Sequence, residues 1–356
     1  MWMDTKAEMK EASRSRGSLG QRVLSGLLFF TGDMEHLNKY MQDKVFGLQL
    51  AVWGLRGVSR VILGNNPLSG ALILAALCWA SPWQALLGTL GVLTSTLTAV
   101  IMGQDGDSSF SVCIAECVCV CVCSAEVSGG LHGFNGMLVS MLMGVFSSAG
   151  DWYWWLLLPA CLGSATCVFL FSGLAPLLDR WDLPVAVFPF NIVIVLYLLC
   201  TGPYNPYFPH HLATPAGPME INATELMAVE VLRGIPLGVG QIFACGALGP
   251  SLLILGAVLL YSPLLAAHAL LGSAVGTLAA FLSAYADIAL SNLLGTVGLP
   301  ACSWAATMIA TLMLLLTGSL STYRIPMGQV MSPEHNLRSR KQWKAGTTAE
   351  GESTDV

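Results

Sequence analysis

Long apolar runs with very few charges occupy most of this 356-residue chain. A helix needs about 20 apolar residues to cross the hydrocarbon core of a bilayer, and several segments approach that length. They are Leu68–Met102 with a break at Ser81-Pro82, Phe134–Ser148, Tyr153–Leu178, Pro184–Thr201, Leu252–Ser283 and Ala301–Gly318. The runs predict an all-α polytopic membrane protein that is surrounded by a lipid bilayer.

The charges agree with this prediction. Only 10% of the residues are charged and 54% are hydrophobic, whereas soluble domains carry roughly a quarter charged residues. Of the 16 Lys and Arg residues, seven lie in residues 1–44 and five in residues 324–344. Basic residues collect on the cytoplasmic side of membrane proteins, so both ends of the chain are predicted to be cytoplasmic.

The loop of residues 202–230 is predicted to lie outside the cell. It contains no Lys or Arg, and Asn222-Ala223-Thr224 forms an N-glycosylation sequon, which is used only on the lumenal or outer face. We therefore expect a glycoprotein with Asn222 as the modified residue.

Cysteines crowd into one short segment of the first half. Cys113, Cys117, Cys119, Cys121 and Cys123 largely alternate with valine, a spacing that suits none of the common zinc sites. A metal site there would need a supporting fold. We interpret the segment as a low-complexity insertion at about 108–127 and expect no metal and no cofactor.

The chain contains signs of an internal duplication, which is sought through repeated elements. Ser81-Pro82 recurs as Ser262-Pro263, 181 residues later, and Leu183-Pro184 recurs as Leu299-Pro300, only 116 residues later. A Leu-Arg-Gly element also occurs in each half, at 55–57 and 232–234. Between these marks the second half is thus 65 residues shorter than the first, partly because of the insertion.

Broken helices in two halves favour a transporter or channel. Interrupted backbone inside a bilayer persists only where protein or a watery cavity covers it, and substrate sites form where such halves meet. The two Leu-Pro elements are therefore candidate half-helices that line a path. The alternative for each is an ordinary helix kinked by proline.

Several sequence blocks, in order from about residue 40 to 335, resemble the vertebrate urea transporter family. These blocks are Asn65–Gly70, Trp154–Pro159, Trp181–Pro184, Tyr204–Pro209 and Gly238–Ile242. The resemblance implies two inverted halves with re-entrant half-helices, one pore in each subunit of a homotrimer, and passive, channel-like diffusion of urea across the plasma membrane.

The resemblance also implies substrate-pore residues. A Leu-Pro-x-x-Thr-x-Pro-Phe motif in each half of the family supplies a pair of hydroxyl groups, and a urea pore needs such oxygen acceptors without rings of charge. The first motif places Pro184, Val187 and Phe190 in this chain, with Val187 where the family has Thr. The second places Pro300 and Ser303, and has alanines in place of Pro and Phe.

Three further residues complete the expected pore. Gln241 matches a family glutamine, Asn66 belongs to the Asn-Pro-x-x-Gly element, and Arg60 stands where the family usually has glutamine. A guanidinium in a membrane pathway needs a partner or reaches the interface by snorkelling. Val187 keeps the volume of Thr and loses an acceptor, which costs ~1–3 kcal/mol if it leaves a urea N–H without a partner.

The shortened half leaves other functions open. A truncated isoform that does not conduct urea and associates with intact subunits is one alternative. An ion or proton transporter is another, with Asp105, Asp107, Asp179, Asp182, Asp287 and His132 as its candidate groups. We expect most of these acids to be solvated near loops, and His210 and His211 to face water. No phosphate loop and no nucleophile elbow occurs in the sequence, so enzyme activity is not expected. We also expect no nucleic-acid partner.

The expected organisation follows from these marks. Residues 1–44 form a cytoplasmic N-terminal region, 45–201 the first membrane half, 202–230 the extracellular loop, 231–318 the second, shortened half and 319–356 a cytoplasmic tail. We expect this chain alone to carry urea weakly or not at all, because its second half lacks about two spans and its Asn-Pro-x-x-Gly element.

Overall fold

The computed structural model describes residues 30–41, 44–102, 125–210, 226–286, 301–319, 325 and 330–342. Within these ranges the chain is helical, and its only β-type pairs are isolated bridges from Ser147 to His210 and from Gly202 to Pro209. The Cys/Val segment, Asn222 and Pro300 lie outside the described residues, so the predictions about them are not tested by the fold.

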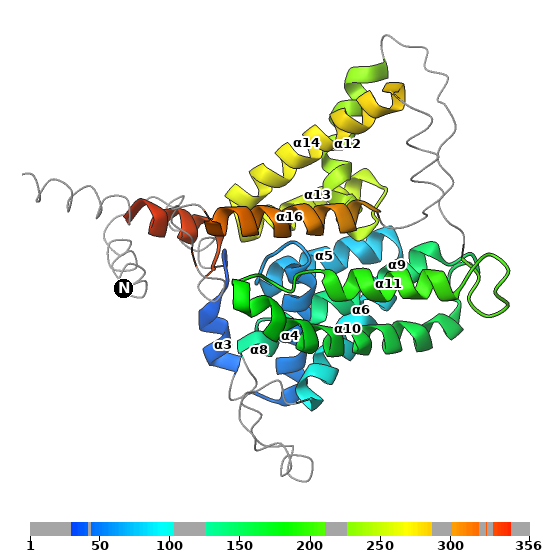
Figure 1. Ribbon diagram of the computed structural model, residues 1–356, viewed down its shortest axis with the longest axis horizontal. Helices are drawn as coiled ribbons and strands as arrows, with labels where there is room; N and C mark the ends of the chain where they lie inside the picture. Colours follow the sequence, from blue (N-terminus) through cyan, green and yellow to red (C-terminus); the bar gives the residue numbers. More distant parts are fainter. Residues whose placement is uncertain are drawn as a thin grey trace, which may run out of the picture.

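The first part of the chain forms a layered group of helices (Figure 1). Its elements are α3 (Glu35–Met41), α4 (Phe46–Arg60), α5 (Pro67–Ala80), α6 (Pro82–Ile101), α8 (Ala125–Ser128), α9 (Gly133–Phe146), the 3-10 turn η2 (Trp154–Leu156), α10 (Leu157–Leu178), η3 (Asp179–Trp181) and α11 (Phe188–Cys200). The second part contributes α12 (Leu226–Gly240), η4 (Gln241–Phe243), α13 (Leu248–Tyr261), α14 (Pro263–Ala286) and α16 (Ala301–Ser319).

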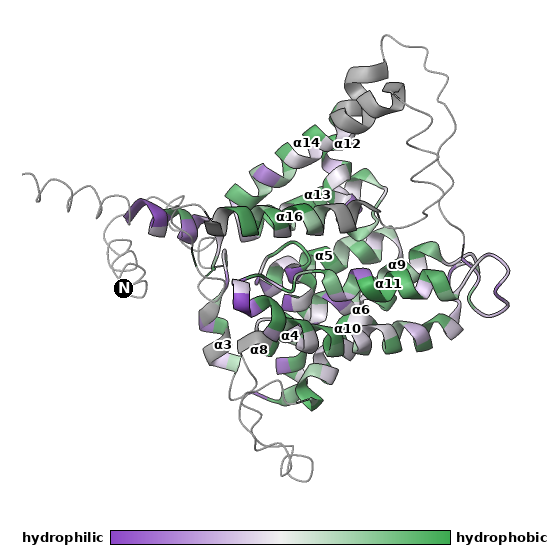
Figure 2. Cartoon of the chain, in the orientation of Figure 1, coloured by the Kyte–Doolittle hydropathy of each residue, from purple (hydrophilic) through white to green (hydrophobic). Residues whose placement is uncertain are grey.

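The prediction of an all-α membrane protein is confirmed. In the described part of the chain two helical segments are long and apolar enough to cross a bilayer, Pro82–Ile101 and Trp154–Trp181, and a third candidate is bent by 76° between Leu232–Phe243 and Leu248–Tyr261. Several shorter helices are also apolar, and Figure 2 shows hydrophobic residues along most of α5, α10, α11 and α16. Large apolar side chains stand exposed on α10 and α16, as expected where lipid is the solvent.

The two Ser-Pro marks break the chain in the same way. Ser81 has φ −156° and ψ 109°, and Ser262 has φ −154° and ψ 115°. A residue before proline is driven out of the helical region, so the helix that precedes each break must end there. Each serine hydroxyl then accepts an amide N–H of the next helix, from Gln84 and from Leu265, which satisfies a donor that lipid could not.

Small residues let α6, α9 and α10 approach closely. A methyl group on Gly91 would collide with the carbonyl oxygen of Gly136, and one on Gly136 would collide with the Ser95 hydroxyl. The Ser140 and Ser164 hydroxyls lie 2.8 Å apart in the same contact. Close backbone approach and hydroxyl hydrogen bonds of this kind hold membrane helices together, because the hydrophobic effect does not drive helix association inside a bilayer.

The second part docks on the first through α5 and α13. The Ser69 hydroxyl of α5 donates to the carbonyl of Ala257 in α13 at 2.8 Å. Around this bond Ile73, Leu77 and Val58 pack with Ile254 and Val258 in one buried cluster. The two parts therefore share a continuous apolar core.

Segments from both ends of the sequence reach the break between α13 and α14. On one side, Gly32 N–H donates to the Tyr261 carbonyl at 3.1 Å and the Tyr261 hydroxyl donates to Asp33 at 3.0 Å. On the other side, the Glu334 carboxylate accepts the Ser262 hydroxyl at 2.6 Å and the Leu264 N–H at 3.1 Å. We call residues 30–34 the N-terminal strap.

The close contact of α6 with α9 predicts that Gly91→Ala destabilises the protein by ~1–3 kcal/mol, the usual cost of overpacking. The added methyl would meet backbone of α9, which cannot rotate away. The measurement is the temperature at which detergent-solubilised protein loses its monodisperse size-exclusion peak.

Gly173→Ala is the matched control, because a methyl group on this α10 residue meets nothing within 4 Å. Equal melting temperatures for the two variants would show that the α6–α9 approach does not limit stability.

Candidate functional site

The first Leu-Pro element is a non-helical segment that leads into α11. Asp182 and Ala186 take left-handed backbone angles, with φ 52° and 47°, and such a conformation is costly for a residue with a side chain. Val187 is the N-cap residue of α11, and Pro189 lies in the first turn. The prediction that this Leu-Pro element breaks the helical path is consistent with this geometry, because α11 begins only at Phe188.

Val187 and Phe190 lie on the wall formed by α9 and α10. Phe190 is buried and Val187 half-buried, and both pack in the cluster that contains Val139 and Leu156. Pro184 is half-buried just before them. The half-buried Val187 side chain therefore packs against apolar groups on its inner side.

Asn135 holds the first Leu-Pro element in place. Its side-chain amide donates to the Ala186 carbonyl at 3.2 Å, and its side-chain oxygen accepts the Phe190 N–H at 3.3 Å. Asn135 is buried in α9, so these bonds replace backbone pairs that the break removes. Sequence reasoning missed this role, although the Gly-Phe-Asn-Gly block that contains Asn135 was visible.

The second Leu-Pro element is represented by α16, which runs across the middle of the view between the α12–α14 group and α11 (Figure 1). Ser303 lies in the first turns of α16, and its side chain is outside the described set. The two Leu-Pro helices meet through a hydrogen bond from the Asn191 amide of α11 to the Thr307 hydroxyl of α16, at 3.2 Å.

Arg60 and Asn66 serve the local structure near α4 and α5. Arg60, half-buried at the end of α4, donates from Nε to the Gly129 carbonyl at 2.9 Å, so its guanidinium has a partner within the protein. Asn66 is fully buried and caps α5 by accepting from the Leu68 and Ser69 N–H groups. Its amide donates to carbonyls of the N-terminal strap at 2.8 and 2.9 Å.

Gln241 lies at the bend between α12 and α13. It is the first residue of η4, its side chain is exposed, and Ala244 at the end of the turn has φ 54°. The structure thus brings Val187 and Phe190 together on one wall and places Gln241, Asn66 and Arg60 on other elements.

Arg56, the arginine of the first Leu-Arg-Gly element, is a buried cation whose structural role the sequence did not predict. Its side chain has no exposed surface, and it donates to the Asn65 side chain at 2.8 Å and to the Met34 and Asp33 carbonyls at 3.2 and 3.3 Å. Arginine is suited to this task because its planar group offers several donors at once. It ties α4 to the N-terminal strap.

The candidate groups for ion transport are dispersed. Asp179 is exposed and Asp182 half-buried near the end of α10, whereas His132 is buried and packs edge-on against Phe171. Asp105, Asp107 and Asp287 lie outside the described residues. No cluster of three or more potential metal ligands occurs in the described part of the chain.

The expectation that His210 faces water is wrong. His210 is 3% exposed, and its Nδ1 shares a 2.8 Å hydrogen bond with the Thr201 hydroxyl. Its backbone N–H also bonds to the Gly202 carbonyl at 3.3 Å, so the residue closes a loop. The neighbouring His211 lies outside the described residues.

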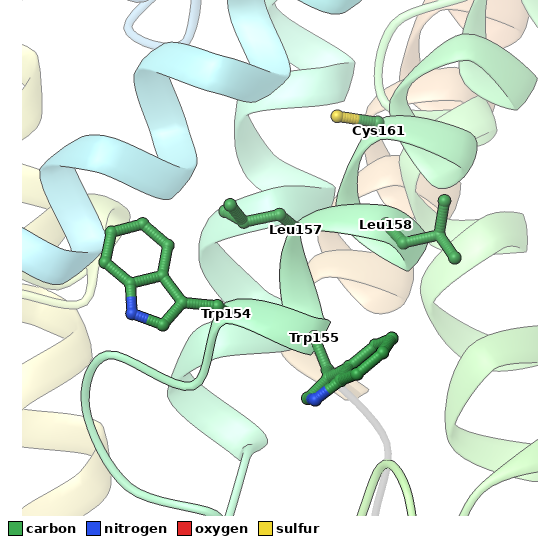
Figure 3. A pocket seen from close by; sticks show the side chains of 5 residues that line it. All are labelled: Trp154, Trp155, Leu157, Leu158 and Cys161. Atoms are coloured by element: carbon green, nitrogen blue, oxygen red, sulfur yellow. The ribbon is translucent and has the colours of Figure 1, made fainter.

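An open pocket of about 520 Å³ lies on the outer side of η2 and α10 (Figure 3). Its lining residues are Trp154, Trp155, Leu157, Leu158 and Cys161. The Trp154 ring also meets the Trp83 ring edge-on and the Trp152 ring at a tilt, at one end of the helices, a position typical of tryptophans at a membrane interface. Because its walls are apolar and offer no acceptor row, this surface does not suit urea.

Comparison with known proteins assigns the family. The family model of the urea transporter, UT, matches residues 51–282. This chain belongs to the urea transporter family. It is 34% identical to Urea transporter 1 of the goat Capra hircus over 93% of this chain and 95% of the relative, and 35% identical to Urea transporter 1 of the rat Rattus norvegicus over 89% of each.

Membership in the urea transporter family makes the protein a membrane transporter of urea and not an enzyme. The match to the goat relative is 382 positions long and includes 93% of this 356-residue urea transporter, about 331 residues. About 51 positions of that relative therefore have no counterpart here. The comparisons lend no support to a separate role as a non-conducting isoform.

Asn135→Leu is expected to destabilise this urea transporter by ~1–3 kcal/mol, because it leaves the Ala186 carbonyl and the Phe190 N–H without their partner in a buried place. The melting temperature of purified protein measures the effect. Thr166→Val is the control, since the Thr166 hydroxyl is exposed and bonds to Leu162 of its own helix. A larger loss in the control than in Asn135→Leu would contradict the role given to Asn135.

Proposed function

We propose that urea crosses this protein passively along a path between its two halves, past Val187 and Phe190 on one side and Ser303 on the other. The contact between α11 and α16 carries the proposal, because it joins the helices that follow the two Leu-Pro elements. Urea offers one carbonyl and four N–H groups, and it needs acceptors beside flat apolar walls. Phe190 and its apolar neighbours supply such a wall.

The remaining candidate residues shape this path from its ends. Pro184 and Pro300 start the two Leu-Pro elements, and Gln241 presents an exposed amide at the bend before α13. Asn66 and Arg60 act by fixing the start of α5 and the end of α4. Two inverted halves, residues 45–201 and 231–318, would place these elements around one central path.

The membrane location, orientation and oligomeric state of the protein are part of the same proposal. We place the protein in the plasma membrane as a homotrimer, with the basic segments of residues 1–44 and 319–356 in the cytoplasm and the loop of residues 202–230 outside. The distribution of Lys and Arg supports this orientation, and the exposed apolar faces of α10 and α16 supply surface for lipid or for neighbouring subunits.

The path predicts that Val187→Thr raises urea flux. Thr has nearly the volume of Val and adds an acceptor, and one hydrogen bond of ~1 kcal/mol corresponds to about fivefold. Urea uptake into vesicles, divided by the amount of inserted protein, measures the change. Val195→Thr, a half-buried position two turns further along α11, is the control.

The same assay tests the effect of the shortened second half. A version in which the missing positions are restored from an intact relative is expected to carry more urea per molecule than this chain, and Val187→Thr is expected to raise its flux further. Saturable flux of this chain equal to that of the restored version would show that the missing positions are dispensable.

Glycosylation tests the orientation. If residues 202–230 lie outside, N-glycosidase treatment of protein from a glycosylating cell shifts its electrophoretic mobility, and Asn222→Gln abolishes the shift. A C-terminal tag is expected to be reached by antibody only after the cells are permeabilised. Staining of that tag on intact cells would rule out cytoplasmic termini.

A further inference from the structure

Asn191 and Thr307 occupy corresponding places in the two Leu-Pro elements. Asn191 lies eight residues after Leu183, and Thr307 lies eight residues after Leu299. The two residues that form the hydrogen bond between α11 and α16 therefore occupy equivalent positions in the two Leu-Pro elements. In transporters built from two related halves, the substrate site lies at the interface between the halves.

The pair also lies one helical turn beyond the motif positions. Asn191 follows Val187 by four residues and donates its backbone N–H to the Val187 carbonyl at 3.0 Å, so the two side chains lie on one face of α11. Thr307 follows Ser303 by the same interval on α16. Asn191 and Thr307 thus form a second layer of polar groups on the proposed path, one helical turn beyond the layer of Val187 and Ser303. We call this layer the second level.

The pattern of burial along α16 shows which face of the helix carries Thr307. Among its described side chains, residues 306–316, Thr307 alone is buried, at 5% exposure, while Thr311 and Leu314 are half-buried. These three positions follow the i, i+4, i+7 spacing of one helix face. Asn191 opposite is 0% exposed, and its amide bonds to the Thr307 hydroxyl, so the buried face of α16 presents Thr307 to α11.

The Asn191 carboxamide resembles the substrate. It is planar and carries one carbonyl and one NH2 group, and urea has the same carbonyl with a second NH2 group. The bond from the Asn191 amide to the Thr307 hydroxyl is consequently of the type that a urea N–H would make with that hydroxyl. A hydroxyl group can exchange one amide donor for another without a change of chemistry.

We propose that the Thr307 hydroxyl is a urea-binding group and that the Asn191 carboxamide occupies urea's place on it until urea arrives. The inference rests on the proposed path between the halves and adds a site one turn past it. Urea displaces the Asn191 amide from Thr307 and binds to the hydroxyl. When urea leaves, the bond between Asn191 and Thr307 forms again. In a chain that lacks the motif hydroxyl at 187, this level supplies an acceptor.

The test measures binding separately from flux. Saturation-transfer NMR detects the methyl protons of acetamide, a carboxamide probe, on the purified full chain in detergent micelles, and added urea competes for the probe. Thr307→Val is expected to weaken the urea-competable signal about fivefold, the ratio for one neutral hydrogen bond. Thr307→Ser, which keeps the hydroxyl, is expected to stay within about twofold of the unaltered chain.

Thr311→Val is the matched control, one turn further on the same face. The Thr311 hydroxyl donates to the Thr307 carbonyl of its own helix at 2.8 Å, so its loss is expected to leave the signal unchanged. All variants are compared only as monodisperse size-exclusion peaks, and Thr307→Ala replaces Thr307→Val if the latter does not fold. An equal loss in Thr311→Val, or the loss of signal in Thr307→Ser, would overturn the proposal.

Asn191→Leu separates urea binding from a merely structural bond. If the carboxamide holds urea's place, its removal leaves the urea-competable signal equal or stronger, whereas a structural pair loses the signal with either partner. A signal in folded Asn191→Leu as weak as in Thr307→Val would overturn the exchange of amide for urea. If this variant does not fold, the Thr307 series decides alone.

Flux measured in parallel keeps the two proposals apart. A Thr307-dependent signal without urea flux would uphold this site and reject the path through the chain. Flux with a signal that Thr307→Val leaves intact would uphold the path and reject this site. No urea-competable signal in the unaltered chain would reject the site as well.

Discussion

The fold depends on how the broken helices satisfy their free backbone groups. Each break exposes amide and carbonyl groups, and each unsatisfied group in hydrocarbon costs several kcal/mol. Side chains take over this task at three of the described breaks: Asn66 caps α5, Ser81 caps α6 and Ser262 caps α14. Asn135 does the same from a neighbouring helix for the segment before α11. Because the breaks are held in this way, short helices can begin and end inside the apolar layer.

Much of the fold could be predicted from local sequence. The apolar runs predicted helices, and the Ser-Pro pairs predicted where the runs are interrupted, because the backbone restriction before proline acts within a few residues. The family was predicted from blocks of sequence in order and is confirmed by the comparisons. The duplication stays a prediction, although the two Ser-Pro breaks share their backbone angles.

The partners of buried polar groups could not be predicted in the same way. Arg56 bonds to carbonyls about 22 positions earlier, and Asn135 bonds to a segment about 50 positions later. The partner of each buried polar group depends on which helices pack together, and this packing cannot be predicted from a local sequence pattern. His210 was predicted to face water because it lies in a polar loop. It is buried instead, because the Thr201 hydroxyl lies beside it and bonds to its ring.

The hydrogen bonds at the break between α13 and α14 can form only late in the synthesis of the chain. Tyr261 bonds to Asp33, 228 residues earlier, and Ser262 bonds to Glu334, 72 residues later. At a synthesis rate of about 5–20 residues/s, the strap waits on the order of 10–50 s before its partner leaves the ribosome. During that interval Arg56 and Asn66, which are made soon after the strap, are the groups that can hold it. The first helices thus keep the beginning of the chain in position for a contact that only late translation completes.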